Sequence, residues 1–242
     1  MAAQSFAPVV LLTRPATQSA RFADSLRARL TGVEIVTSPL IVPTFLNPTL
    51  PAKSWAAIIL SSETGAEAAG RLKALLPRHA FCVGDRTAQA ARAAGFTPQS
   101  AHGDAEALLA LILSQPLAPL LHLRGREARG DLAKRLSANG IPTDEAIVYA
   151  QEEHTLTPEA VALLQGTTPI LAPVFSPRSA QILAAECHRI PATAPITLIG
   201  MSAAVAGVSG PWSGTTVIAA QPTAESMVQA VIKLLPQGRA LE

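Results

Sequence analysis

Short apolar runs alternate along the chain with segments in which apolar residues recur every three or four positions. Leu11 and Leu12 lie in the first run, and Phe22, Leu26 and Leu30 follow at helical spacing. Strands of about four to six residues alternating with helices of about ten predict α/β units around parallel sheets. The expected strands are residues 9–12, 33–36, 56–60, 81–83 and 120–123, the expected helices are residues 17–30, 66–76, 87–94, 106–113 and 130–138, and the same rhythm returns after residue 168.

A short repeat occurs twice in this pattern. It consists of a strand, an arginine, a helix, a glycine and an extended segment. Arg14 is followed by Gly32 after 18 residues, and Arg124 is followed by Gly140 after 16. The two segments are therefore expected to fold alike.

A longer repeat also occurs twice. Ser61 follows one strand and Gly84 comes 23 residues later, whereas Ser176 follows another strand and Gly200 comes 24 residues later. The order along the chain is short, long, short, long, which predicts two similar domains.

The repeats also predict how the domains are assembled. A short repeat is too small to bury a core, so it must share a sheet with a long one. We expect a continuous domain over residues 52–146 and a discontinuous one over 1–36 plus 159–242. The Pro-rich segment 37–51 and the polar segment 147–158 would be linker strands that pair with each other, with a cleft between the domains. The alternative is a single doubly wound domain with a long insert.

Composition excludes several classes of protein. The 242 residues are 49% hydrophobic, yet no apolar run reaches the roughly 18 residues of a membrane helix. Residues 1–8 lack the basic and apolar regions of a secretory signal. The formal charge of +2 is not that of a nucleic-acid-binding protein. We therefore expect a cytoplasmic protein that binds neither membrane nor nucleic acid.

The metal-ligating residue types are sparse. Cys82 and Cys187 are the two cysteines, too few for a disulfide framework or a four-cysteine zinc site. The five histidines have no ligand spacing and are expected to be surface or core residues.

Hydroxyl residues, glycines and arginines gather where predicted strands turn into helices. In open α/β sheets, ligands bind outside the carboxyl ends of the strands, where helix N-termini point. Each serine or threonine taken singly is explained by helix capping. Together, their hydroxyls and the helix N–H groups would form an anion-binding surface. The candidate binding residues are Thr13, Arg14, Ser61, Ser62, Gly84, Thr87, Arg124, Ser176, Pro177, Gly200 and Ser202.

Tyr149 is the only tyrosine and lies at the start of the second linker. A phenol both donates and accepts hydrogen bonds, so it can serve chemistry if it faces a ligand. From the residues alone, packing is the simpler role.

These segments, in this order and spacing, resemble the uroporphyrinogen-III synthase family over roughly residues 9–234. Any one piece is unspecific, whereas the ordered set is specific. The family fold has two α/β domains joined by a two-stranded ladder, as expected above. The segments that carry the resemblance are 11–15, 60–62, 82–88, 95–96, 123–124, 140–149, 174–180, 199–203 and 220–223.

The resemblance implies a reaction. Hydroxymethylbilane, a linear tetrapyrrole with eight carboxylates, loses water and cyclises with inversion of ring D, without a metal or organic cofactor. Tyr149 falls where the family has a tyrosine thought to assist loss of the hydroxyl. Hydroxyls at family positions would bind the carboxylates. Those residues are Ser61, Ser62, Thr87, Ser176 and Ser202. A monomer and a transient handover of substrate from hydroxymethylbilane synthase are the expected assembly and partner.

Three departures and two alternatives accompany this interpretation. Ser202 stands where threonine is commoner, Pro173 interrupts a predicted strand, and Glu63 brings a negative charge beside Ser61 and Ser62. The alternatives are a non-catalytic, two-lobed cytosolic anion-binding protein and a regulatory paralogue without turnover.

Overall fold

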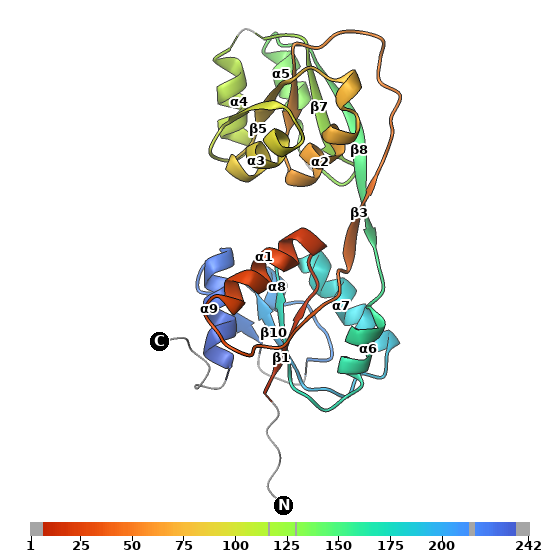
Figure 1. Ribbon diagram of the computed structural model, residues 1–242, viewed down its shortest axis with the longest axis vertical. Helices are drawn as coiled ribbons and strands as arrows, with labels where there is room; N and C mark the ends of the chain where they lie inside the picture. The colour runs from red at the N-terminus through yellow and green to blue at the C-terminus, as the bar shows by residue number, and fades with distance from the viewer. Residues whose placement is uncertain (1–6, 116, 129, 213–215, 236–242) are drawn as a thin grey trace, which may run out of the picture. The chain divides into compact units, whose positions relative to one another are not determined.

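The chain folds into two compact units in the computed structural model (Figure 1). Unit 1 comprises Met1–Val42 and Glu153–Glu242, and unit 2 comprises Pro43–Glu152. The structure describes residues 7–115, 117–128, 130–212 and 216–235. The chain therefore leaves unit 1, builds unit 2 and returns.

Unit 1 is built on a parallel sheet. Its elements are β1 (Val9–Leu12), α1 (Ala16–Arg27), β2 (Ile35–Thr37), α6 (Pro158–Leu164), β9 (Ile170–Val174), α7 (Pro177–Arg189), β10 (Ile196–Gly200), α8 (Ala203–Ala206), β11 (Val217–Ile218) and α9 (Ala224–Leu234). The strand order is β11-β10-β9-β1-β2, with parallel pairing throughout this order. Side chains of α1 and α9 pack on one face, and those of α6, α7 and α8 pack on the other. The first short repeat thus shares its sheet with the second long one.

Burial on both faces explains the apolar runs of the strands. In β1, Val9 and Leu11 join the core under α6 and α7, whereas Val10 and Leu12 join the core under α1 and α9. All four residues are buried. A strand covered on both faces has no polar side, which is why it reads as a continuous apolar segment.

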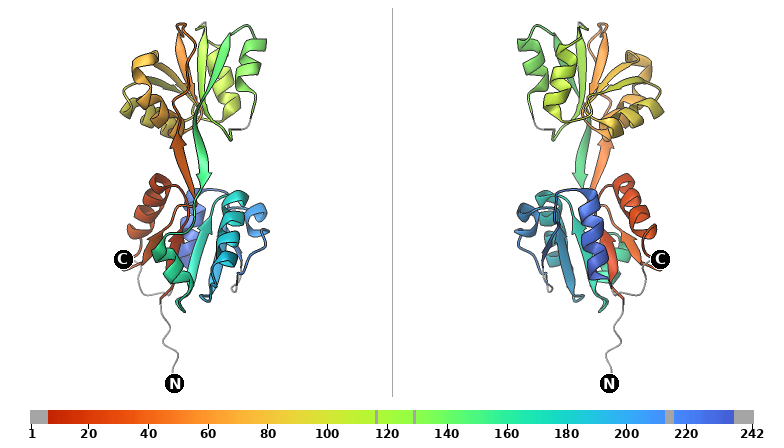
Figure 2. Two further views of the ribbon diagram at one scale, coloured as in Figure 1. Left: turned by 90° about the vertical axis from the view of Figure 1, so that its right-hand side faces the viewer. Right: turned by 90° about the vertical axis from the view of Figure 1, so that its left-hand side faces the viewer.

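Unit 2 repeats this design. Its elements are β3 (Ile41–Phe45), β4 (Ala57–Leu60), α2 (Glu63–Arg71), the 3-10 helix η1 (Lys73–Leu75), β5 (His79–Cys82), α3 (Asp85–Ala93), β6 (Thr97–Ser100), α4 (Ala105–Leu113), β7 (Leu120–Gly125), α5 (Leu132–Ala138) and β8 (Thr143–Glu153). The strand order is β3-β8-β7-β4-β5-β6, and the pairs from β8 to β6 are parallel. Helices α2 and α3 contribute to one core, and α4 and α5 contribute to the other. Figure 2 shows helices on both sides of each sheet.

The predicted fold class is confirmed: the chain is α/β, with two mainly parallel sheets flanked by helices. Its elements differ in detail. Helix α2 begins at Glu63 rather than at residue 66, because Ser62 caps it four residues before the apolar pattern starts. Strand β6 was not expected, since its residues Thr97–Ser100 are polar and lie at the sheet edge.

The two passages between units lie within strands. One boundary falls after Val42 in β3 and the other after Glu152 in β8, and these strands are neighbours in the sheet order. Leu46 donates its backbone N–H to the carbonyl of Val148 at 2.9 Å. Strand β8 begins earlier than the expected linker because its first residues pair with β7.

Pro173 lies inside β9, which is a central strand. The ladder between β9 and β1 pairs Ile170 with Val9 and Leu171 with Val10, and it ends before Pro173. The ladder with β10 continues past the proline to Val174. The missing N–H thus falls where β9 no longer pairs with β1, which limits its cost to the sheet.

The glycines of the two short repeats share a backbone conformation. Gly32 after α1 has φ of 63° and Gly140 after α5 has φ of 83°. Glycine adopts this left-handed conformation without a steric penalty. Gly140 directly follows the C-cap of α5, whereas Gly32 lies in a turn five residues after the end of α1.

No helix within the described ranges is long and apolar enough to span a membrane.

Candidate active site

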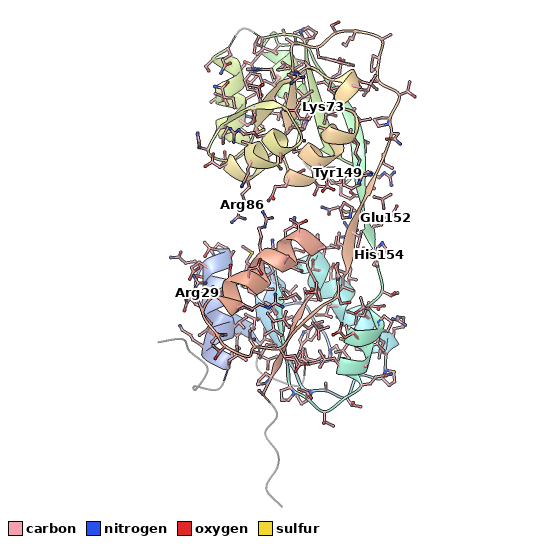
Figure 3. The ribbon with its side chains drawn as sticks, in the orientation of Figure 1. Arg29, Lys73, Arg86, Tyr149, Glu152 and His154 are labelled. Atoms are coloured by element: carbon pink, nitrogen blue, oxygen red, sulfur yellow. The ribbon has the colours of Figure 1, made fainter. Side chains whose placement is uncertain are left out.

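Polar side chains meet at the carboxyl ends of the unit 2 strands. Ser61 and Ser62 follow β4, and Arg124 lies near the end of β7. Tyr149 lies on β8, as labelled in Figure 3. Because these strands are parallel neighbours in the order β8-β7-β4, their ends share one edge. Four predicted site residues therefore lie at one edge of this sheet in two groups, Ser62 with Tyr149 on one face and Ser61 with Arg124 on the other.

Ser62 and Tyr149 contact each other. The Ser62 Oγ lies 3.0 Å from the Tyr149 hydroxyl oxygen. The same Oγ accepts the backbone N–H of Gly65 at 2.9 Å and so caps α2. Glu63 occupies the first turn of α2, where the positive end of the helix dipole favours a carboxylate.

Gly125 makes room for the Tyr149 ring, and a Cβ on Gly65 would lie at ordinary contact distance from it. The β7–β8 register shifts between Arg124 and Gly125, and Gly125 then pairs with Tyr149. A Cβ on Gly125 would lie 2.6 Å from the phenol Cζ, closer than side chains tolerate, and one on Gly65 would lie 3.9 Å from Cε1. Tyr149 is only 7% exposed. The ring is therefore held in a fitted position by the backbone around it.

A second polar cluster lies on the opposite face of the sheet, the side covered by α4 and α5. The Ser61 Oγ is 3.3 Å from His122 Nε2. One oxygen of Glu145 lies 3.5 Å from His122 Nδ1 and 3.2 Å from Arg124 Nε. These are ion-pair distances. Among the described residues, His122 Nδ1 and Arg124 Nε are buried and have no partner in hydrogen-bond geometry.

Burial governs the charge of this cluster. It lowers the pKa of His122 below its ordinary value, and the nearby Glu145 carboxylate opposes the shift only in part. The imidazole is therefore neutral near pH 7. A cavity of about 100 Å³ opens beside it, lined in part by Ser61, His122 and Arg124.

Gly84 and Thr87 occupy the start of α3, one strand further along the sheet. Gly84 is extended and offers no side-chain cap, so the first turn of α3 lacks the hydroxyl that Ser62 supplies to α2. Thr87 is buried, at 4% exposure. Of the pair, Gly84 is thus the more accessible to a ligand.

Thr13 and Arg14 follow β1 in unit 1. Thr13 is buried, and its carbonyl accepts the N–H of Leu40 at 3.1 Å. The Arg14 guanidinium lies 3.8 Å from the centre of the Phe175 ring, and its carbonyl accepts the Ser19 hydroxyl. The stacked guanidinium is held at the strand end by a cation–π contact.

The other unit 1 candidates begin helices. Ser176 caps α7 by accepting the N–H of Ser179 at 3.1 Å, with Pro177 in the first turn. Ser202 begins α8 without a side-chain cap, so its hydroxyl is not used for capping. Gly200 ends β10, and a Cβ there would lie 2.9 Å from the backbone nitrogen of Ala206. The Ser176 hydroxyl is therefore used as a helix cap, whereas the Ser202 hydroxyl is not.

Sequence reasoning missed three residues that shape these clusters: His122, Glu145 and Gly125. A signal existed for His122, because it stands two residues before Arg124 and so faces the same side of β7. Glu145 pairs with His122 across the ladder, and Gly125 meets Tyr149 only through a register shift. Neither pairing is visible in local sequence.

Within the described ranges, no group of three or more His, Cys, Asp or Glu side chains is arranged to hold a metal ion.

The fold and site define a class: a two-unit α/β protein whose hydroxyls, helix starts and single phenol lie at the ends of parallel strands. The family model described as Uroporphyrinogen-III synthase HemD matches residues 21–229. Because that match spans most of the sequence, the chain belongs to the uroporphyrinogen-III synthase family, which acts in tetrapyrrole biosynthesis.

A solved structure of a family member agrees in fold. The chain is similar to uroporphyrinogen-III synthetase from Helicobacter pylori 26695, with a TM-score of 0.62 and 16% identity over 94% of this chain and 99% of that one. A mutant uroporphyrinogen III synthase from the extremely thermophilic bacterium Thermus thermophilus matches at a TM-score of 0.46 and 15% identity over 93% and 98% of the two chains, too low a score to add weight. No curated protein matches the chain at a significant level.

Proposed function

We propose that this protein is a uroporphyrinogen-III synthase, which converts hydroxymethylbilane into uroporphyrinogen III and water. The observation that carries the proposal is the Tyr149 phenol at the carboxyl edge of unit 2, 3.0 Å from the Ser62 hydroxyl and walled by Gly125. A phenol fixed in this way suits a general acid that protonates a leaving hydroxyl.

The chemistry begins with loss of the terminal hydroxyl of the bilane. The C–O bond breaks, its electron pair leaves with the oxygen, and the oxygen takes the Tyr149 proton to depart as water. The electron-poor azafulvene that remains is attacked by the substituted end of ring D to give a spiro-pyrrolenine. Fragmentation and reclosure invert the ring, and the proton released as the pyrrole reforms returns to the phenolate.

Positioning is the larger part of the task. The bilane closes without catalysis to the isomer with an unflipped ring D, so the enzyme must favour attack through the substituted carbon. We propose that the strand-to-helix turns bind the carboxylates of the substrate. In unit 2 these turns carry Ser61, Ser62, Gly84, Thr87 and Arg124, and in unit 1 they carry Thr13, Arg14, Ser176, Pro177, Gly200 and Ser202.

The physical basis is the positive end of each helix. A single helix N-terminus stabilises an exposed anion by only about 0.3–1 kcal/mol. Several such contacts to one substrate with many carboxylates add up to useful affinity, without requiring a strongly basic chain.

The chemistry of the substrate also bears on location and partners. A polycarboxylate does not cross membranes unaided, so we propose that the enzyme works in the cytoplasm, in the same compartment as the enzyme that supplies the bilane. We further propose that it acts as a monomer and takes the unstable bilane from hydroxymethylbilane synthase by a transient handover.

Incubation with freshly generated hydroxymethylbilane tests the proposal. The products are oxidised and the porphyrin isomers are separated by chromatography. A synthase yields mainly isomer III, in proportion to enzyme. A non-catalytic anion-binding protein or an inactive paralogue leaves only isomer I, as in a control with heat-denatured protein, and that result would overturn the proposal.

A further inference from the structure

The contact between Ser62 and Tyr149 gives the serine a task beyond capping a helix. We propose that Ser62 is a positioning residue: it donates its hydroxyl proton to the Tyr149 oxygen, which leaves the phenol proton free for the departing hydroxyl of the substrate. This inference rests on the proposed function and changes the expected role of Ser62, from a carboxylate ligand to a partner of the general acid.

The direction of the hydrogen bond follows from what each group must do. A serine hydroxyl has one proton to donate and two sites that accept. One accepting site of Ser62 is taken by the Gly65 N–H at 2.9 Å, and its proton can be directed to the phenol oxygen 3.0 Å away. In the opposite direction, Tyr149 would give its own proton to Ser62 and would have none for the substrate.

The start of α2 favours the same direction. Helix α2 has nine residues, and the positive end of its dipole lies at Ser62. Donation from Gly65 polarises the Ser62 hydroxyl, and a polarised hydroxyl is a better donor to the next group in the chain. Negative charge that develops on the phenol oxygen is therefore stabilised by Ser62 when the proton leaves.

Gly125 completes the arrangement from the other side. A Cβ at this position would lie 2.6 Å from the phenol Cζ and 2.9 Å from its hydroxyl oxygen. The ring can reach Ser62 only because Gly125 has no side chain. The wall of β7 and the hydroxyl of Ser62 thus fix both the ring and its hydroxyl group.

The proton balance is closed. Gly65 keeps its proton, Ser62 keeps its proton while donating a hydrogen bond, and Tyr149 loses one proton to the departing oxygen. The phenolate is neutralised later by the proton that ring D releases. No oxidant, reductant or additional reactant is needed.

The test compares three Ser62 variants with a matched control. Ser62→Ala removes both the cap and the donor. Ser62→Thr keeps both. Ser62→Asp keeps a cap, but its carboxylate only accepts hydrogen bonds, so the phenol O–H would donate to it and point away from the substrate. The control is Thr157→Ala, which removes the cap of α6, where no tyrosine lies.

The expected results separate positioning from stability. Ser62→Ala and Ser62→Asp lower kcat for isomer III by about tenfold or more with KM within about twofold, Ser62→Thr restores most of kcat, and Thr157→Ala leaves kcat unchanged. Adding Ser62→Ala to Tyr149→Phe causes no further loss, because the serine acts through the phenol.

A spectroscopic readout is independent of activity. The chain has one tyrosine, so protein labelled with ¹³C at tyrosine Cζ gives a single resonance that reports Tyr149. It should move in Ser62→Ala and Ser62→Asp, return towards the wild-type position in Ser62→Thr, and stay in place in Thr157→Ala.

Additive losses in the double variant, or a Ser62→Asp enzyme as active as wild type, would overturn the positioning role. If wild-type protein instead forms only isomer I, the proposed function fails, while the resonance still shows whether Ser62 contacts the phenol.

Discussion

At the scale of single residues, the site depends on the missing side chain of Gly125 as well as on the hydroxyl of Ser62. Gly125 has no side chain, and Tyr149 fills the space that one would take. Ser62 serves two partners through one oxygen. Such fitted contacts fix a phenol within the fraction of an ångström that proton transfer requires.

Gly125→Ala should therefore act on Tyr149. The added methyl group would lie 2.6 Å from Cζ, so the ring must move away from Ser62. We expect a loss of isomer-III kcat of roughly tenfold, with the protein still folded by circular dichroism. Unchanged kcat, together with an unshifted tyrosine resonance, would show that the ring does not occupy this position.

His122 should make stability depend on pH. Burial lowers its pKa in the folded state, so the unfolded chain binds a proton that the folded chain does not. The free energy of unfolding is therefore unaffected by this group above about pH 6.5, and it falls as the pH drops below that value because the unfolded chain takes up the proton.

Urea unfolding at several pH values measures this effect. For each protein, the free energy of unfolding is expressed relative to its own value at pH 8. Between pH 7 and pH 5 this free energy should fall less for His122→Gln than for wild type. An equal or larger fall in the variant would contradict the claim that buried His122 causes the loss of stability at low pH.

At the scale of elements, the alternation of apolar and polar positions predicted most strands and helices. It failed where the determining contact is not local. Helix α2 starts at a serine cap before its apolar stripe begins, and β6 is a polar edge strand held by its neighbour β5. The pairing of Gly125 with Tyr149 depends on a register shift in β7. Such a shift is set by tertiary packing, so no local pattern indicates it.

The short repeats yield a prediction at this scale. Gly140 has φ of 83° with open space around its Cβ position, so alanine there meets strain of the backbone only. Gly140→Ala should lower the free energy of unfolding by about 1–2 kcal/mol. Gly140→Asn should lose less, because asparagine tolerates this conformation better. Equal stability of all three proteins in urea would contradict the left-handed turn.

At the scale of the whole molecule, the order of the repeats explains two sheets from one chain. Each short repeat adds strands to a sheet that a long repeat of the same unit builds, so neither core is complete until both segments have been made. The candidate site residues also reflect this order, because they lie on strand-to-helix turns at the carboxyl ends of the parallel strands in each unit. Which residues touch across those turns could not be predicted from the sequence.

The two cysteines report on the cores of the two units. Cys82 lies in unit 2 and Cys187 in unit 1, and both are buried. Burial raises the pKa of Cys82 to about 12 and that of Cys187 to about 11. Both thiols should resist a thiol reagent at pH 8 in the native protein and react fully in denaturant. Single Cys→Ala variants identify each thiol, and rapid native labelling of either would contradict the packing of its unit.

The most direct test of the central claim compares wild type with Tyr149→Phe on hydroxymethylbilane, following the rate and the ratio of isomers III and I. The account predicts that the wild type forms mainly isomer III and that Tyr149→Phe forms it roughly ten- to a hundredfold more slowly, but not at zero rate, because binding still directs ring D. Equal isomer-III rates for the two proteins would contradict the role of the phenol.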